Sequence, residues 1–280
     1  MIQDIEPKIF NNNFKNKKAE PQDLFLSYKG DTVLVREEKD KLWYPSFSDF
    51  EVEYPHLIDK SQFLFSIDDI NYYLVEEMGL DSVDGWCYVT TNRFRTEQKY
   101  WRSYAGVVGW QLNRWYNNHR FCSKCGKSMK HSDKERMLYC EICGFQKYPT
   151  ISPCVIVAVH NGNRLLLTKY AGRAYTKFAL VAGFAEIGES LEQTVHREVK
   201  EEVGIKVKNL KFYKSQPWPF TDTLLVGFFA ELDGDDTITI QEDELSLGVW
   251  VNREDIPPEE LKISLTSEMM EAFRTGLVEL

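Results

Sequence analysis

The sequence predicts an α+β fold in three parts, and three observations indicate this class. Short apolar runs of strand length alternate with turn-forming residues through roughly the first hundred positions. Two closely spaced cysteine pairs follow, and the rest of the chain opens with an apolar strand before one well-capped helix. We therefore expect a mixed α/β domain at residues 1–118, a four-cysteine ribbon at 119–150 and an α+β domain at 151–280.

The composition is that of an ordinary globular chain, which excludes several classes of protein. Of 280 residues, 43% are hydrophobic and 14% are aromatic, too many for a disordered or collagen-like sequence. The longest apolar run, Pro153–Val159, is far shorter than the roughly 18 residues that span a membrane. Met1–Glu6 carries early acids instead of a secretion signal. We expect a cytoplasmic protein, and the net charge of −9 argues against unspecific nucleic-acid binding by the whole surface.

The first hundred or so residues contain strands separated by turns. Leu24–Tyr28 and Thr32–Val35 flank Gly30 and Asp31, and this order predicts a hairpin. No catalytic cluster occurs in this part of the sequence. The other elements expected here are strands at Phe63–Ile67 and Trp86–Val89 and a helix from Glu97 to about Asn118.

Four of the six cysteines form a metal-binding pattern. Cys122 and Cys125 are separated by two residues, as are Cys140 and Cys143, and a glycine follows each pair. Two thiolates at this spacing can bind one ion from a tight turn, and two such turns complete a tetrahedral zinc shell. Because the shell leaves no open position, we expect one structural Zn²⁺ per chain. The remaining cysteines, expected to be small buried side chains, are Cys87 and Cys154.

The segment around these cysteines is basic, unlike the rest of the chain. Between His119 and Lys147, seven Lys and Arg side chains accompany three acids. These cations either offset the negative charge of a zinc ion bound by four thiolates or favour a polyanionic partner.

The last part of the chain opens with a hairpin and contains a helix with clear end signals. Ser190 lies three residues before Gln193, which predicts a capping box, and Gly204 is a typical helix stop. The expected elements are a buried strand at Cys154–Val159, a turn at Asn161–Asn163, a strand at Arg164–Thr168 and a helix at Leu191–Val203.

Three glutamates on this helix have an unusual placement. On a helical wheel, Glu202 and Glu198 fall on or beside the face that carries Val195 and Val199, whereas a solvated charge run would lie opposite that face. Carboxylates near a core are costly unless they are protonated or bound to a cation. With Glu201, they offer the oxygen ligands that Mg²⁺ and Mn²⁺ prefer.

The same segment resembles the Nudix box. All of its fixed positions are occupied, by Gly183, Glu189, Arg197, Glu198, Val199, Glu201, Glu202, Gly204 and Ile205. The resemblance implies a Nudix fold, an α/β/α sandwich around a mixed sheet, and hydrolysis of a nucleoside diphosphate linked to another group. It also implies that Glu198, Glu201 and Glu202 bind the divalent metal, that Glu189 and Arg197 brace the loop and the helix, and that Gly183 and Gly204 are structural.

A second motif, downstream of the box, is similar to a signature of NADH pyrophosphatases of the NudC type. A four-cysteine ribbon before the Nudix domain and a divergent N-terminal domain are also typical of that subfamily, so the similarity covers nearly the whole chain. The resemblance implies an additional metal ligand at Glu244 and a homodimer in which Tyr148 of one subunit and Phe184 of the other sandwich the nicotinamide ring. The substrate-binding residues that it implies are Tyr148, Phe184, Ser215, Gln216, Trp218 and Phe220.

The function that this resemblance implies is metal-dependent hydrolysis of NAD(H) to NMN(H) and AMP, with NAD-capped RNA as a further substrate. The chain departs from the subfamily at Thr150, Ser152 and the segment Thr221–Thr223, which favours two alternatives less strongly. One is a Nudix hydrolase that acts on ADP-ribose or dinucleoside polyphosphates. The other is a zinc-ribbon module that binds nucleic acid on an inactive Nudix scaffold.

Overall fold

The computed structural model describes residues 1–38, 41–76, 80–96, 100–172, 176–258 and 263–278, and these form two compact units. One unit comprises Ile2–Thr150 with the short segment Pro219–Thr221, and the other comprises Met1, Ile151–Trp218 and Asp222–Leu280. The C-terminal unit therefore begins at the residue where we expected a domain to start. The ribbon falls within the N-terminal unit, and its separation at residue 118 stays a prediction.

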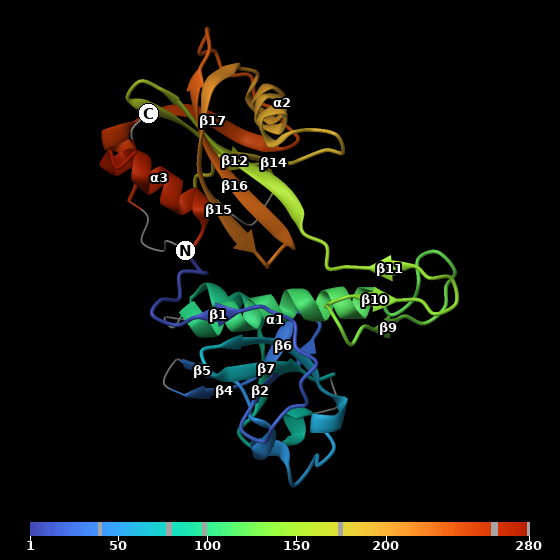
Figure 1. The fold of residues 1–280 in the computed structure, drawn as a ribbon. Coiled ribbons are helices and arrows are strands. Elements are labelled where there is room, and N and C mark those ends of the chain that lie inside the picture. Colours follow the sequence, from blue (N-terminus) through green and yellow to red (C-terminus); the bar gives the residue numbers. More distant parts are fainter. Residues whose placement is uncertain (39–40, 77–79, 97–99, 173–175, 259–262, 279–280) are drawn as a thin grey trace. The chain divides into compact units, whose positions relative to one another are not determined.

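The N-terminal unit contains two small sheets (Figure 1). The first has the order β1-β6-β7-β2, and the second has the order β3-β4-β5 with β8 also paired to β4. Their strands are β1 (Phe10–Asn11), β2 (Leu24–Leu26), β3 (Tyr28–Lys29), β4 (Thr32–Glu38), β5 (Lys41–Trp43), β6 (Gln62–Ile67), β7 (Ile70–Leu74) and β8 (Cys87–Thr90). Short 3-10 helices lie at Phe47–Phe50, Ile58–Lys60, Leu80–Ser82 and Thr91–Arg95.

The predicted hairpin forms, but its first strand is shorter than expected. Tyr28–Lys29 pairs antiparallel with β4 around Gly30, whose φ is +60°, whereas Leu24–Leu26 pairs in parallel with β7 in the other sheet. The chain thus passes from one sheet to the other at Ser27. Another expectation was wrong: Cys87 is exposed, because β8 flanks only β4 and leaves that side chain open to solvent.

A long helix, α1 (Tyr100–Asn118), packs closely against these sheets. Residues 97–99, where the predicted helix was expected to begin, lie outside the described residues. An added Cβ at Gly106 would lie 2.2 Å from the Tyr44 hydroxyl oxygen, so only glycine permits this approach. The Tyr28 hydroxyl donates to the Gly106 carbonyl at 2.6 Å. After α1 comes the ribbon, with the strand order β11-β10-β9; its strands are β9 (Lys130–His131), β10 (Leu138–Tyr139) and β11 (Gln146–Lys147).

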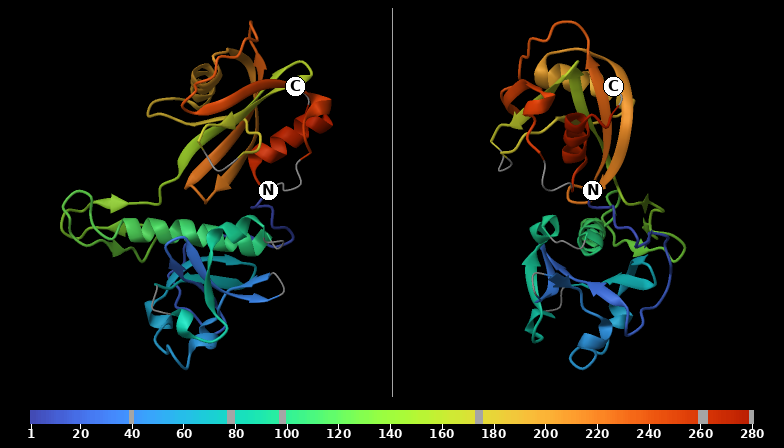
Figure 2. Two further views of the ribbon diagram at one scale, coloured as in Figure 1. Left: turned by 180° about the vertical axis from the view of Figure 1, so that it is seen from behind. Right: turned by 90° about the vertical axis from the view of Figure 1, so that its left-hand side faces the viewer.

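The C-terminal unit is a mixed six-stranded sheet with one helix on each face (Figures 1 and 2). Its order is β15-β16-β12-β13-β17, β14 also pairs with β12, and only the β12–β16 pair is parallel among these neighbours. The elements are β12 (Ser152–Asn161), β13 (Arg164–Tyr170), β14 (Val181–Phe184), α2 (Leu191–Val203), β15 (Val207–Trp218), β16 (Thr223–Leu232), β17 (Leu245–Asn252), a 3-10 helix (Arg253–Asp255) and α3 (Leu265–Thr275).

Alternation along β12 builds the two cores of this unit. Val155, Val157 and Val159 pack with the α2 valines, whereas Ile156 and Ala158 pack with α3. Buried residues on both sides explain why this strand reads as a continuous apolar run. The expected hairpin from β12 to β13 and the expected α/β/α sandwich are therefore confirmed. Among the described residues, no helix is both long and apolar enough to span a membrane.

Candidate functional site

The helix that carries the glutamates has the predicted bounds and the predicted caps. The Ser190 hydroxyl accepts the Gln193 N–H at 3.3 Å, and the Gln193 side chain accepts the Ser190 N–H at 2.7 Å. This capping box pairs two donors that a helix start leaves free. At the other end, Gly204 has φ +76° and stops the helix. The helix therefore has a fixed start and a fixed rotation, which fixes the direction of each side chain.

Two of the three helix glutamates are buried, as the periodicity predicted. Glu198 and Glu202 are 9% and 2% exposed, while the side chain of Glu201 is 53% exposed. Burial raises the pKa of Glu198, and the negative charges of Glu201 and Glu244 raise it further, although Arg197 opposes the shift. The buried thiol of Cys154 lies within the same field, and its pKa rises to about 12 through burial and these two buried glutamates. A bound cation would relieve this concentration of negative charge.

Gly183, at the end of β14, provides the space for the Glu198 carboxyl group. A Cβ atom at position 183 would lie 1.9 Å from Cδ of Glu198 and 2.0 and 2.2 Å from its two oxygens. Gly183 is not among the residues with positive φ, so the requirement for glycine is steric and not conformational. The first glycine of the box therefore acts by letting a carboxylate lie against the strand backbone.

Arg197 connects the helix to the preceding loop through several carboxylates. Its Nε and Nη2 donate to the two oxygens of Glu189 at 2.7 and 2.9 Å. Its Nη1 donates to Glu198 Oε1 at 2.7 Å and to Glu201 Oε2 at 2.9 Å, and Nη2 also donates to the Phe184 carbonyl at 2.8 Å. One guanidinium therefore neutralises part of the charge of three acids.

Glu189 is fixed on its other side by the loop itself. Its carboxylate accepts the Glu186 N–H at 3.0 Å and the Thr194 hydroxyl at 2.9 Å. These donors and Arg197 lower the pKa of Glu189 to about 2, with the Arg197 hydrogen bonds as the largest cause. The fully buried Thr194 was not singled out in the sequence, since its role depends on a loop that folds back onto the helix.

Glu244, expected to be a further metal ligand, is an exposed residue directly before β17. Its carbonyl accepts the Ala171 N–H at 2.8 Å, which ties the loop to the end of β13. Its charge reaches Glu198, as the pKa of that group shows. Among the described residues, however, only the ribbon cysteines bring three or more ligand atoms within 4.8 Å of one another. The carboxylates lie in one region but are not drawn together as a closed ligand set.

The predicted substrate-binding residues of the C-terminal unit differ in exposure. Phe184 is 53% exposed at the end of β14, and Ser215 is exposed on β15. Trp218 is partly buried against the core on the α3 side of the sheet. Gln216 is fully buried: its Nε2 donates to the Ile263 carbonyl at 2.9 Å and its Oε1 accepts the Leu265 N–H at 2.6 Å. The Gln216 side chain therefore holds the start of α3.

Two predicted residues belong to the N-terminal unit. Tyr148 is 48% exposed, and its hydroxyl donates to Glu135 Oε1 at 3.1 Å. Phe220 is 9% exposed, and its ring lies 4.0 Å from the Arg95 guanidinium carbon. Their contact with a substrate stays a prediction.

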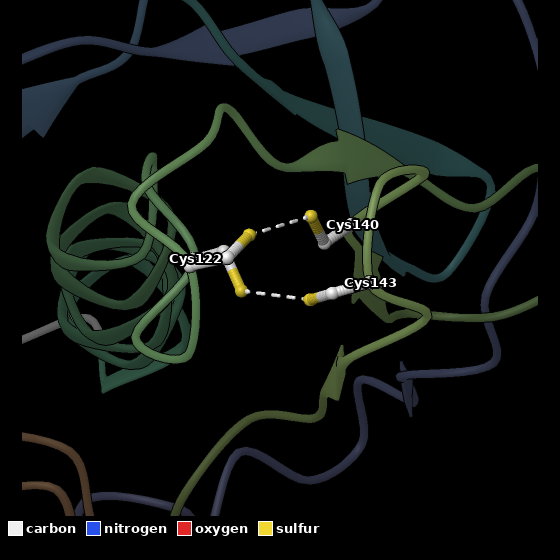
Figure 3. A group of neighbouring side chains, drawn as sticks. Cys122, Cys140 and Cys143 are labelled. Carbon is white, nitrogen blue, oxygen red and sulfur yellow. Dashed lines mark hydrogen bonds between the residues drawn. The ribbon is translucent and has the colours of Figure 1, made fainter.

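The four ribbon cysteines form the expected metal site (Figure 3). The sulfurs of Cys122 and Cys143 are 3.6 Å apart, and those of Cys125 and Cys140 are 3.5 Å apart. Tetrahedral zinc with Zn–S bonds of about 2.3 Å requires sulfur separations of about 3.8 Å, close to these values. In each turn the glycine after the second cysteine has φ +71° and donates its N–H to the carbonyl of the first cysteine, at 2.8 and 2.9 Å. The four sulfurs fit a structural zinc ion.

Comparisons with known proteins agree with this division of the chain. Residues 150–273 match the NUDIX domain, and residues 117–145 match the NADH pyrophosphatase zinc ribbon domain. A protein from Pseudomonas fluorescens (strain Pf0-1), named NAD-capped RNA hydrolase NudC, is 40% identical over 169 residues, which are 60% of this chain and 61% of that protein. A protein of the same name from Enterobacter sp. (strain 638) is 44% identical over 149 residues, 53% of this chain and 57% of that protein.

The matched segment thus spans about three fifths of the length of these relatives. Among solved structures, a NUDIX hydrolase from Nitrosomonas europaea matches 56% of this chain and 90% of its own, with 22% identity and a TM-score of 0.48.

Proposed function

We propose that this chain, which carries a Nudix domain behind an NADH pyrophosphatase zinc ribbon domain, hydrolyses the pyrophosphate bond of NAD(H) to give NMN(H) and AMP. The observation that carries the proposal is the burial of Glu198 and Glu202 beside the core, with Glu201 and Glu244 adding charge to the same region. Proteins that bury carboxylates in this way compensate them with a cation. The names of the two relatives, both called NAD-capped RNA hydrolases, support the substrate class.

In this proposal Glu198, Glu201, Glu202 and Glu244 hold Mg²⁺ or Mn²⁺. The donor set fits, because hard divalent cations take carboxylate oxygens and retain water for bridging to phosphates. When bound, such a cation neutralises charge on the pyrophosphate and activates the attacking water. Metal binding has to compete with Arg197, since one of its nitrogens donates to both Glu198 and Glu201. The bidentate pair of Arg197 with Glu189 keeps the guanidinium in place when those two contacts are released.

The remaining chemistry belongs to the chain's own side chains. An exposed carboxylate, that of Glu201 or Glu244, accepts the proton of the attacking water, since a base must reach solvent and substrate together. Phe184 offers an exposed ring beside the helix for stacking on the nicotinamide or adenine. In the proposed homodimer Tyr148 of the partner subunit contributes the second ring. A cytoplasmic location is part of the proposal, since reducing conditions keep the four zinc thiols available.

Removal of NAD caps from RNA is a second activity of the same site, because the cap presents the same pyrophosphate bond. Exposed lysines on the ribbon, Lys124 and Lys127, provide charge for the RNA backbone, whereas Lys130 is already paired with Glu141 at 2.8 Å. Charge reversal at Lys124, Lys127 and Lys130 should lower activity on capped RNA and leave NADH hydrolysis unchanged. Equal loss on both substrates, or no loss on either, would contradict this assignment.

The alternative substrates rest on sequence departures, and one of these has a structural explanation. Asp222 adopts φ +58° at the turn between β15 and β16, a region that Asp tolerates better than most residues. Its carbonyl accepts the Ser152 N–H at 2.9 Å. Asp222 therefore serves the turn, which weakens the case for ADP-ribose or dinucleoside polyphosphates as the main substrate.

The deciding experiment measures turnover of the full chain with Mg²⁺ or Mn²⁺ on NADH, NAD⁺, ADP-ribose, diadenosine tetraphosphate and NAD-capped RNA. We expect the highest kcat/KM on NAD(H) or capped RNA, and expect Glu202→Gln to remove most turnover without changing Tm by more than a few degrees. Glu192→Gln is the matched control, since Glu192 is exposed in the first turn of the same helix. Full activity of Glu202→Gln would refute the metal assignment, and no turnover of any substrate would favour the nucleic-acid-binding alternative.

A further inference from the structure

A cavity of about 330 Å³ lies in the C-terminal unit, where the end of β12 meets β15 and β16 (Figure 1). It is separate from the glutamates of α2. Cys154, whose pKa responds to Glu198 and Glu202, is six residues before His160 on β12, and a strand of that length spans about 20 Å. The volume is within the range of pockets that bind small molecules. The cavity is lined by His160, Asn209, Leu210, Lys211, Phe229 and Glu231.

A break in the sheet ladder accompanies this cavity. The register of β15 against β16 shifts between Lys208 and Lys211, and Asn209 within the shift has φ +50°. The extra residues of a β-bulge bend a strand and redirect its side chains. Here Asn209 turns its amide toward β16, where Nδ2 donates to Glu231 Oε2 at 2.7 Å. The bulge thus places Leu210 and Lys211 at the cavity instead of in a regular ladder.

His160 is a buried polar side chain at this cavity with an unmet hydrogen-bonding capacity. It is 8% exposed, and its Nδ1 is buried with no hydrogen-bond partner among the described residues. Burial lowers the pKa of His160; Lys211 and Arg253 lower it further, and Glu231 opposes them. The ring is therefore neutral at pH 7. Because a buried polar group without a partner is costly, such a group in a cavity wall indicates a bound molecule.

The charges around the ring favour a negatively charged occupant. Glu231 is compensated by Asn209 and by Lys208, whose Nζ lies 3.8 Å from Glu231 Oε1. Lys211 and Arg253 both act on the imidazole as positive charges. Leu210 and Phe229 supply an apolar wall that a bare inorganic ion would not need.

We propose that this cavity binds a small organic oxyanion, with its acidic group near Lys211 and His160 and its apolar part against Leu210 and Phe229. The site is distinct from the catalytic one, and it does not depend on the proposed function. A phosphate ester and a carboxylate share the chemistry that these residues recognise.

The test uses NMR of the histidine side chains in the full chain with zinc bound and no other divalent cation added. The chain has five histidines, and His160 is assigned from His160→Gln or, if that variant does not fold, by substituting the other four. The probes are AMP, succinate and the uncharged nucleoside adenosine. We expect millimolar AMP or succinate to shift the His160 signal in a saturable way, and adenosine to leave it unchanged. A response to AMP alone identifies a phosphate site, and a response to succinate alone identifies a carboxylate site.

A variant series completes the test. Lys211→Gln should weaken the apparent affinity about tenfold, equivalent to about 1.4 kcal/mol. Lys214→Gln is the matched control, because it removes the same charge from the same strand at a residue that does not line the cavity. No shift of His160 with either anion, an equal shift with adenosine, or an unchanged affinity in Lys211→Gln would overturn the proposal.

Discussion

Substitution of Gly183 by alanine tests the link between the strand backbone and the proposed metal site. The added Cβ would lie about 2 Å from both carboxylate oxygens of Glu198, whereas ordinary contacts begin near 3.4 Å. The carboxylate must therefore move by more than about 1 Å, since a packed strand cannot retreat. Misplacement of a catalytic group by this distance costs about 100-fold in rate, which corresponds to about 2.7 kcal/mol of transition-state stabilisation.

The assay is kcat/KM for NADH hydrolysis with saturating Mg²⁺, combined with thermal unfolding and with Mn²⁺ binding followed by electron paramagnetic resonance. We expect Gly183→Ala to lower kcat/KM by about two orders of magnitude and to weaken Mn²⁺ binding, at an overpacking cost of about 1–3 kcal/mol in stability. Gly227→Ala is the control, because its Cβ would meet only the flexible Met269 sulfur, at 2.7 Å, and side-chain and backbone atoms beyond 3 Å. Wild-type activity and Mn²⁺ affinity in a folded Gly183→Ala protein would refute the reasoning.

Three further predictions concern stability. Gln216→Ala removes two buried hydrogen bonds that hold the start of α3, so urea unfolding should show a loss of about 2–4 kcal/mol; a loss under 1 kcal/mol would argue against this role. Zinc chelation should unfold the ribbon, since its four thiols then lose their common ligand; circular dichroism that is unchanged after complete zinc release would contradict this. The folded-state pKa of Glu189 is about 2, below its usual 4.5, so its contribution to stability is complete above pH 4.5 and is lost as the pH falls toward 2. Urea unfolding across this range should show a weaker pH dependence in Glu189→Gln, and equal slopes would count against the Arg197 bridge.

The sequence determined the features that depend on spacing along the chain. The bounds of α2 follow from Ser190, Gln193 and Gly204, and its buried face follows from a helical repeat, so the sequence alone was enough to assign Glu198 and Glu202 to that face. The cysteine cluster and the β12–β13 hairpin are equally local. Each of these patterns works because neighbouring residues constrain one another directly.

Tertiary structure decided the features that join distant segments. Periodicity could not reveal that Gly183 gives space to a carboxylate fifteen positions away, or that Gln216 binds the start of a helix 49 residues later. Nor could it reveal that β8 would leave Cys87 exposed, or that a bulge at Asn209 would place Lys211 beside a buried histidine. These contacts depend on which strands become neighbours, and strand pairing is settled by packing of the whole core and not by any short stretch of sequence.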